Sequence, residues 1–210
     1  GFAEFAAKHY GVSLTSVNIS KEQVSYAKER CKGLDVNFYL CDYRDDQTYN
    51  PSKKEFDKMV SIGMCEHVGY KNYQVLMDVV SRNLKKHGLF LLHTIGSNCF
   101  VTSCEPWTNK YIFPNGVLPS IAGLAKAMEK DFVMEDWHNF GAYYDLTLMA
   151  WHRNFVANWE KIKSRYDNRF YRMWTYYLLS CAGLFRARGA QLWQVVLSKS
   201  GVPGVYQAVR

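Results

Sequence analysis

The sequence predicts an α/β fold with a mostly parallel, doubly wound sheet and helices on both of its faces. Short apolar runs of strand length alternate with longer segments whose apolar residues recur at helical spacing. Glycines and capping residues separate these segments, and such alternation is typical of β-α-β units with parallel strands. A length of 210 residues and a hydrophobic content of 48% favour a single domain spanning residues 1–210.

The first part of the chain begins with a segment whose aromatic and alanine residues have helical spacing, and Gly11 ends it. Ser20 and Gln23 have the spacing of a capping box at the start of a second helix, which Gly33 ends. The expected elements are a helix over 2–10, a strand over 13–19, a helix over 20–31, a strand over 36–41 and an acidic turn over 42–46.

The remaining segments continue the alternation and then change character after Gly96. The polar, proline-bearing segment 97–119 is long enough to predict a functional lid or a substrate loop. The other expected elements are a strand over 56–64, a helix over 72–86, a strand over 89–95, a helix over 120–129, a strand over 132–136, helices over 146–166 and 169–188, and a strand over 191–198.

Glu66 and His93 each follow or end a strand in the middle of this pattern. Parallel strands end at one edge of the sheet, where α/β proteins bind their ligands, so the sequence places an acid and an imidazole at a candidate site. The structural alternatives are a glutamate that caps the next helix and a histidine satisfied within the core.

The net charge of +7 is compatible with nucleic acid, with an anionic membrane surface or with neither. No zinc-finger or RNA-binding motif is present, so nucleic acid is disfavoured. Six cysteines lack a Cys-x-x-Cys pair, which predicts reduced thiols and no metal site. No apolar run approaches the roughly 18 residues of a membrane span.

The last third of the chain is rich in aromatic residues at helical spacing, interleaved with basic residues. Packing explains most of the aromatic residues; the rest predict walls for a large apolar or cationic ligand. The basic residues suit an anionic bilayer surface or form a solvated helix face. The aromatic residues are Trp151, Phe155, Trp159, Phe170, Trp174, Tyr176 and Tyr177, and the basic ones are Arg153, Lys161, Lys163, Arg165, Arg169 and Arg172.

The order of elements is that of a Rossmann-like class I methyltransferase, and several longer motifs are more specific. With these motifs the chain resembles the cyclopropane-fatty-acyl-phospholipid synthase family over nearly its whole length. The motifs are residues 17–23 (VNISKEQ), 41–45 (CDYRD), 63–69 (GMCEHVG), 92–96 (LHTIG), 110–116 (KYIFPNG) and 135–141 (EDWHNFG).

The resemblance implies an enzyme that uses S-adenosylmethionine. It would transfer a methylene group to a cis double bond of an unsaturated phospholipid acyl chain, through a carbocation that a bound bicarbonate deprotonates. The partner would be phospholipid at an anionic membrane surface, and the location would be cytoplasmic, peripheral to the inner face of the membrane. A homodimer is left open.

The resemblance also implies roles for individual residues. Glu66, His93 and Tyr144 match the bicarbonate-holding positions, with a backbone group of Ile95, and because a carboxylate repels an anion, Glu66 would carry or share a proton. Cys181 matches a cysteine assigned to the active site; a lining role for the acyl slot is favoured over a nucleophilic one. The implied cofactor-binding residues are Gly1, Asn18, Ile19, Ser20, Gln23, Asp42, Tyr43 and Arg44.

The chain departs from the family at its start, where the first strand and most of the glycine-rich cofactor loop are missing and Gly1 matches only the last glycine. We therefore expect a domain that is incomplete at its N-terminus, and by itself poorly stable and inactive. Two alternatives to a fragment of a cyclopropane synthase remain. One is a lipid methyltransferase that adds a methyl branch without closing a ring, and the other is an inactive fragment that binds lipid or a partner protein.

Overall fold

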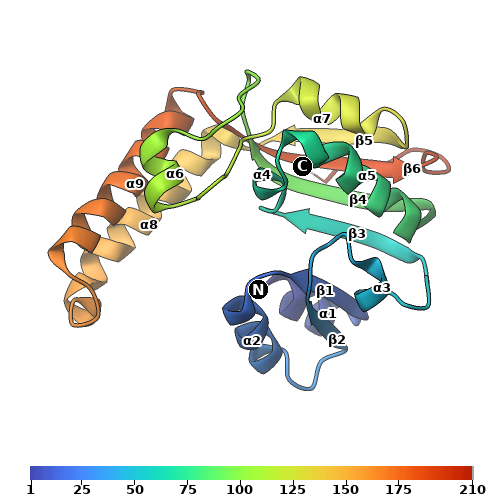
Figure 1. Ribbon diagram of the computed structural model, residues 1–210, viewed down its shortest axis with the longest axis horizontal. Helices are drawn as coiled ribbons and strands as arrows, with labels where there is room; N and C mark the ends of the chain where they lie inside the picture. The colour runs from blue at the N-terminus through green and yellow to red at the C-terminus, as the bar shows by residue number, and fades with distance from the viewer. Residues whose placement is uncertain (210) are drawn as a thin grey trace. The chain divides into compact units, whose positions relative to one another are not determined.

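The computed structural model describes residues 1–209, and the chain divides into two compact units, Gly1–Glu55 and Phe56–Arg210 (Figure 1). The first unit contains a two-stranded parallel sheet, in which Asn18 pairs with Leu40 at the ends of the strands. Both strands therefore end at the same edge. The elements of this unit are α1 (Phe2–Tyr10), β1 (Leu14–Asn18), α2 (Lys21–Arg30), β2 (Val36–Leu40) and α3 (Asp46–Tyr49).

Local capping explains how the helices of the first unit begin and end. Gly11 has a φ of 60°, and its N–H donates to the carbonyl of Ala7, which ends α1. The hydroxyl of Ser20 accepts from the N–H of Gln23 and starts α2, which is one half of the predicted capping box. The N–H of Ser20 donates to the side chain of Asn18 rather than to that of Gln23.

The second unit contains a four-stranded sheet in the order β3-β4-β6-β5. Strands β3 and β4 are parallel, whereas β6 is antiparallel to both β4 and β5. The elements are β3 (Phe56–Ile62), α4 (Cys65–Val68), the 3₁₀ helix η1 (Tyr70–Asn72), α5 (Tyr73–Asn83), β4 (Leu84–Gly96), α6 (Pro106–Tyr111), α7 (Ile121–Met128), β5 (Phe132–Asn139), α8 (Gly141–Ile162), α9 (Asn168–Arg186) and β6 (Gln191–Lys199).

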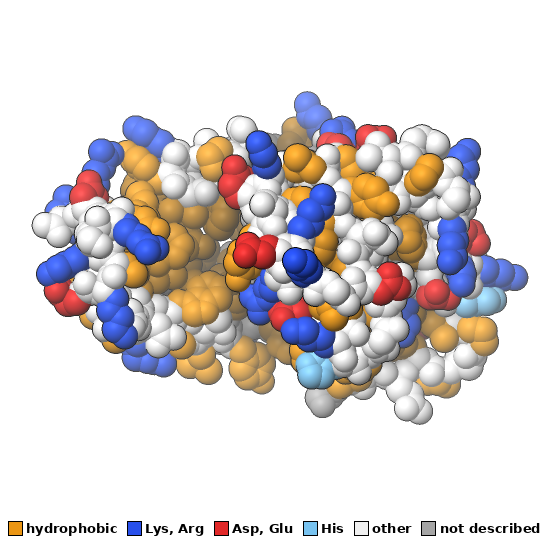
Figure 2. Space-filling view, turned by 90° about the horizontal axis from the view of Figure 1, so that it is seen from below, with side chains coloured by type: hydrophobic (Ala, Val, Ile, Leu, Met, Phe, Trp, Pro, Cys, Tyr) orange, Lys and Arg blue, Asp and Glu red, His pale blue; other side chains and the backbone are white. Residues whose placement is uncertain are grey.

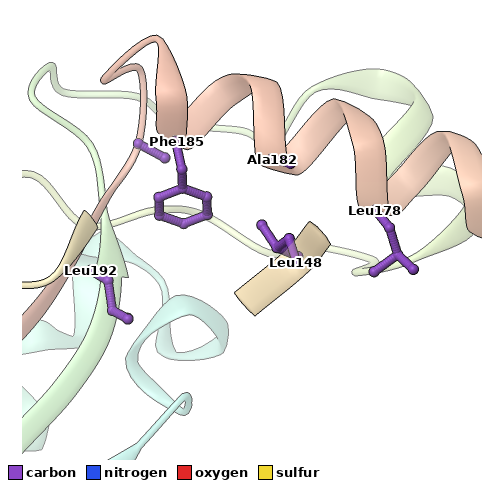
Figure 3. Packing of buried hydrophobic residues seen from close by; sticks show 6 residues of the cluster. Leu148, Leu178, Ala182, Phe185 and Leu192 are labelled. Atoms are coloured by element: carbon purple, nitrogen blue, oxygen red, sulfur yellow. The ribbon is translucent and has the colours of Figure 1, made fainter. Parts of the chain in front are cut away.

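Helices α5 and α7 lie side by side along the sheet, and α8 and α9 form a hairpin beyond one end of it (Figure 1). A hydrophobic cluster joins this hairpin to the sheet (Figure 3). Leu148 comes from α8, Leu178 and Phe185 from α9, and Leu192 from β6. The cluster therefore fixes the base of the hairpin beside the ends of the central strands.

The structure corrects several predicted boundaries. The helix predicted over 72–86 ends at Asn83, and β4 begins at Leu84, because a bulge in the pairing with β3 and a φ of 63° at His87 allow the strand to start earlier. The helix predicted over 146–166 begins at Gly141 and ends at Ile162, and the last helix, predicted over 169–188, begins at Asn168 and ends at Arg186. The strand predicted over 132–136 continues to Asn139, where it remains paired with β6.

The segment 97–119, predicted as a loop, contains the helix α6. The carboxylate of Glu105 accepts from the N–H groups of Trp107 and Thr108, and Pro106 occupies the first turn, where a missing N–H costs nothing. This capping pattern explains why a short helix forms in a polar segment.

Candidate active site around Glu66

Glu66 lies in α4, directly after β3, and is only 9% exposed. Its Oε1 accepts a hydrogen bond of 2.7 Å from the N–H of Ile95. Its Oε2 is also buried but has no partner within residues 1–209. A buried carboxylate oxygen without a partner is costly, which marks this atom as a position where a ligand could bind.

The segment 97–119 is hydrogen-bonded to Glu66 as well. The N–H of Val117 donates to the backbone carbonyl of Glu66 over 2.8 Å, and the ring of Phe113 lies 5.8 Å from that of His67. Glu66 is therefore held through its side chain by β4 and through its backbone by this segment.

His93 pairs with Ile62, the last residue of β3, so the prediction that Glu66 and His93 reach the same edge of the sheet is confirmed. The amide nitrogen of Gln194 on β6 lies 3.3 Å from Nδ1 of His93. An amide N–H can only donate, so Nδ1 accepts and the ring proton is held on Nε2. Burial lowers the pKa of His93, and the charge of Glu66 opposes that effect.

Tyr144, Ile95 and Cys181 pack against the hydrophobic cluster at the base of the hairpin. Burial raises the pKa of Tyr144, and Cys181 and Glu66 add to this effect. Burial also raises the pKa of Cys181 to about 11, so its thiol remains protonated and a poor nucleophile at neutral pH. The structure thus brings Ile95, His93 and Tyr144 near Glu66 and places Cys181 near Tyr144.

Two residues of this region were missed by sequence reasoning. Cys65 is fully buried, and burial raises its pKa well above the ordinary range. Tyr73, the first residue of α5, is 3% exposed, and its hydroxyl has no partner within residues 1–209. Burial raises the pKa of Tyr73, with contributions from Cys65 and Glu66. The only signal for Tyr73 in the sequence was its position shortly after the motif 63–69, which follows β3.

The predicted cofactor residues of the first unit meet at the edge where β1 and β2 end. Asn18 donates to the side chain of Gln23 over 2.8 Å and accepts from the N–H of Ser20 over 2.8 Å. Ile19 lies between them and is 77% exposed. Asn18 therefore holds the start of α2 in a defined conformation.

The turn after β2 is organised by one ion pair. Arg44 donates from Nε and Nη2 to the two carboxylate oxygens of Asp42, over 2.8 and 2.7 Å. These hydrogen bonds lower the pKa of Asp42, and the guanidinium lies 5.7 Å from the ring centre of Tyr43. Gly1 is the N-cap residue of α1.

Other classes of site receive no support from the described residues. No group of three His, Cys, Asp or Glu side chains within residues 1–209 could hold a metal ion. None of the helices in that range is both long and apolar enough to pass through a bilayer.

The profile of one protein family, described as mycolic acid cyclopropane synthetase, matches residues 1–195. The chain belongs to this family. The cyclopropane-fatty-acyl-phospholipid synthase of Escherichia coli (strain K12) is 56% identical over 95% of this chain and 50% of that protein. The sphingolipid C9-methyltransferase A of Emericella nidulans is 30% identical over 94% of this chain and 40% of that protein. The chain spans about half the length of these relatives or less.

Solved structures share the fold. A mycolic acid cyclopropane synthase complexed with SAH and CTAB has a TM-score of 0.81 at 23% identity, covering 93% of this chain and 73% of that one. A cyclopropane synthase from Mycobacterium tuberculosis has a TM-score of 0.80 at 21% identity, covering 92% of this chain and 72% of that one. The predicted α/β fold of the methyltransferase class is therefore confirmed, while the antiparallel β6 makes the sheet of the second unit mixed.

Proposed function

We propose that this chain is methyltransferase-domain sequence of a cyclopropane-fatty-acyl-phospholipid synthase. In this reaction a carbon of a cis double bond in a phospholipid acyl chain would take the methyl group of S-adenosylmethionine, whose sulfur–methyl bond breaks so that S-adenosylhomocysteine leaves. Loss of one proton from the transferred methyl group would then close a three-membered ring. The observation that carries the proposal is the buried Glu66. Ile95 holds one of its oxygens, the other has no partner in the described part of the chain, and its charge acts on His93 and Tyr144.

Bicarbonate, when bound, would supply the oxygen base that accepts the lost proton. The residues present fit this anion. Nε2–H of His93 and the phenol of Tyr144 can donate hydrogen bonds to it, and Oε2 of Glu66 is free to bond a protonated oxygen. The N–H of Ile95 is used by Glu66 and orients that carboxylate, so a backbone contact of Ile95 with the anion would come from its carbonyl group.

S-adenosylmethionine, when bound, would supply the methyl group on a sulfonium. The first unit would hold its adenosine part with the polar residues at the ends of β1 and β2. Asn18, Ser20 and Gln23 already form a hydrogen-bonded set there, and the pair formed by Asp42 and Arg44 fixes the next turn. Ile19, Tyr43 and Gly1 would complete the set of contacts.

An apolar slot for the acyl chain would follow a row of aromatic rings along α9. Neighbouring ring centres are 4.3 Å apart for Tyr166 and Phe170, 6.0 Å for Phe170 and Trp174, and 5.2 Å for Trp174 and Tyr177. Tyr177 then lies 6.1 Å from Phe113, which contacts His67 beside Glu66. Aromatic faces would also stabilise positive charge on the reacting carbon.

The proposal is tested in a hybrid enzyme in which this chain replaces the matching half of the E. coli synthase. Glu66→Gln should lower turnover at least about a hundredfold while leaving the affinity for S-adenosylmethionine unchanged. Glu129→Gln, at an exposed position, is the matched control. Equal losses of turnover and affinity would show that Glu66 serves the fold or the cofactor instead.

Bicarbonate dependence tests the base separately. Removing dissolved carbon dioxide from the assay should abolish ring formation by the hybrid, and adding bicarbonate should restore it. Activity that is indifferent to bicarbonate would discard the proposed base. Mass spectrometry and NMR of the product distinguish a ring from a methyl branch, and thus this proposal from a lipid methyltransferase without ring closure.

The natural setting would be the inner face of an anionic membrane, approached from the cytoplasm by a peripheral protein. Failure of the hybrid to bind cofactor would favour the remaining alternative, a fragment that binds lipid or a partner protein. A homodimer would be detected by the mass of the purified protein in solution.

A further inference from the structure

The hairpin tip, defined as residues 160–172, concentrates positive charge. It contains five Lys or Arg residues and two Asp or Glu residues, a net charge of +3. All five basic side chains are exposed. Figure 2 shows hydrophobic side chains gathered at the α8–α9 end of the molecule, with Lys and Arg side chains at its outer margin.

The two acidic residues of the tip interact with residues of the tip itself. Glu160 pairs with Lys163, and the carboxylate of Asp167 accepts from the N–H of Phe170 over 2.7 Å and caps α9. No carboxylate partner is found for Lys161, Arg165 or Arg172 within residues 1–209. These three cations are therefore available to an external anion.

The tip also presents an aromatic side chain among its cations. Tyr166 is 46% exposed, and its ring stacks on Phe170 with a centre distance of 4.3 Å. Tyrosine combines an apolar ring with a polar end, so it is favoured at the interface between a bilayer and water. Tyr166 and Phe170 are the first rings of the row that leads toward Glu66.

We propose that the hairpin tip is the surface by which the protein docks on an anionic phospholipid bilayer. The cations would meet the lipid phosphates, Tyr166 would enter the headgroup region, and the aromatic row would lie next to the acyl chains. This inference rests on the proposed function for its choice of partner. Each unpaired basic residue near an anionic surface adds several-fold to the affinity, so a loss of three is measurable.

The test is co-sedimentation of the full chain, without cofactor, with vesicles of phosphatidylcholine and phosphatidylglycerol. A variant with Lys161→Gln, Arg165→Gln and Arg172→Gln should bind about a hundredfold more weakly. The control, with Lys28→Gln, Lys32→Gln and Lys54→Gln, loses the same charge at exposed positions of the first unit and should bind nearly as well as the parent. Far-ultraviolet circular dichroism verifies that both variants are folded.

Several outcomes would overturn the proposal. The first is that the tip variant and the control variant lose vesicle binding equally. The second is that the parent binds vesicles of phosphatidylcholine alone as well as the anionic vesicles. The third is that the parent binds duplex DNA and the tip substitutions weaken that binding as much as they weaken vesicle binding. A second measurement isolates Tyr166. At high salt, where charge attraction is screened, Tyr166→Ser should still lower vesicle binding, and an unchanged affinity would contradict insertion of the ring.

Activity of the hybrid separates this proposal from the proposed function. The tip variant should lose activity on phospholipid vesicles and retain it on phospholipid dispersed in detergent. A parent hybrid inactive on both substrates would count against the proposed function while leaving the vesicle-binding result to decide the docking surface. Equal loss on both substrates would contradict a docking role.

Discussion

The carboxylate of Glu66 accepts a 2.7 Å hydrogen bond from the N–H of Ile95, although 29 residues separate them in the chain. The backbone carbonyl of Glu66 accepts a second long-range bond, from Val117. These contacts hold one oxygen of the carboxylate in place, and the other is buried with no hydrogen-bond partner among residues 1–209. A group ordered in this way loses little further freedom when a ligand binds.

The close packing of β4 against Trp193 predicts a strong effect of Gly96→Ala. An added Cβ would lie 2.0 Å from the ring of Trp193, which is 1% exposed and cannot move away. We expect a loss of about 3 kcal/mol of unfolding free energy, measured by urea denaturation. Gly183→Ala is the control. Its Cβ would meet no atom within 4 Å, so the better helix propensity of alanine should stabilise α9 by about 0.5–1 kcal/mol. Equal effects would contradict the packing.

The unpartnered hydroxyl of Tyr73 predicts that Tyr73→Phe stabilises the chain. Removing a buried hydroxyl that makes no hydrogen bond saves its desolvation cost, so the unfolding free energy should rise by about 1 kcal/mol. Tyr143→Phe, at a position that is 65% exposed, should change it little. A clear destabilisation by Tyr73→Phe in a denaturant titration would mean that the hydroxyl has a partner, such as a buried water.

The lowered pKa of His93 predicts how stability depends on pH. In the unfolded chain His93 has the ordinary histidine pKa of about 6.5. Burial lowers this pKa in the native state, so the native state gives up the His93 proton at a lower pH. Below the unfolded pKa the unfolded state binds more protons. The contribution of His93 is therefore complete above the unfolded pKa and is lost as pH falls toward the folded value.

Denaturant titrations between about pH 7.5 and 5.5 test this expectation. The unfolding free energy of the parent should fall over this range, and His93→Asn should reduce the slope. Parallel curves for the parent and His93→Asn would contradict the assignment.

The raised pKa of Cys181, about 11, predicts that its thiol reacts slowly with iodoacetamide at neutral pH. Cys99 is exposed and should be alkylated first, which peptide mapping by mass spectrometry can follow. In the hybrid enzyme Cys181→Ala should lower turnover by less than about tenfold, because the mechanism needs no covalent adduct with this residue. Rapid labelling of Cys181, or loss of all activity, would support a nucleophilic role.

Local patterns were sufficient to predict most elements and the placement of Glu66 and His93 at the same edge of the sheet. Alternation of apolar residues, the capping box at Ser20 and the glycine at Gly11 all act within a few residues, so the sequence displays them directly. The short helix α6 was missed because it lies in a polar segment without helical periodicity and begins at a cap that depends on the conformation of the Glu105 side chain.

The site residues show the same division. The motif around Glu66 and the strand end at His93 could be recognised from the sequence, whereas Tyr73 could not, because only burial reveals that its hydroxyl lacks a partner. Likewise, the resemblance implied that a backbone group of Ile95 helps to hold an anion, and the hydrogen bond from its N–H to Glu66 is visible only in the structure.

The sequence by itself determined the α/β class, the order of strands and helices along the chain, and the residue types that carry the candidate chemistry. Only the tertiary structure decided the antiparallel direction of β6, the bulge at the start of β4, and the gathering of Tyr144 and Cys181 beside Ile95. The physical reason is the range of the interactions. Helix periods and caps are set between near neighbours in the chain, whereas sheet direction and the packing of the hairpin depend on contacts between distant segments.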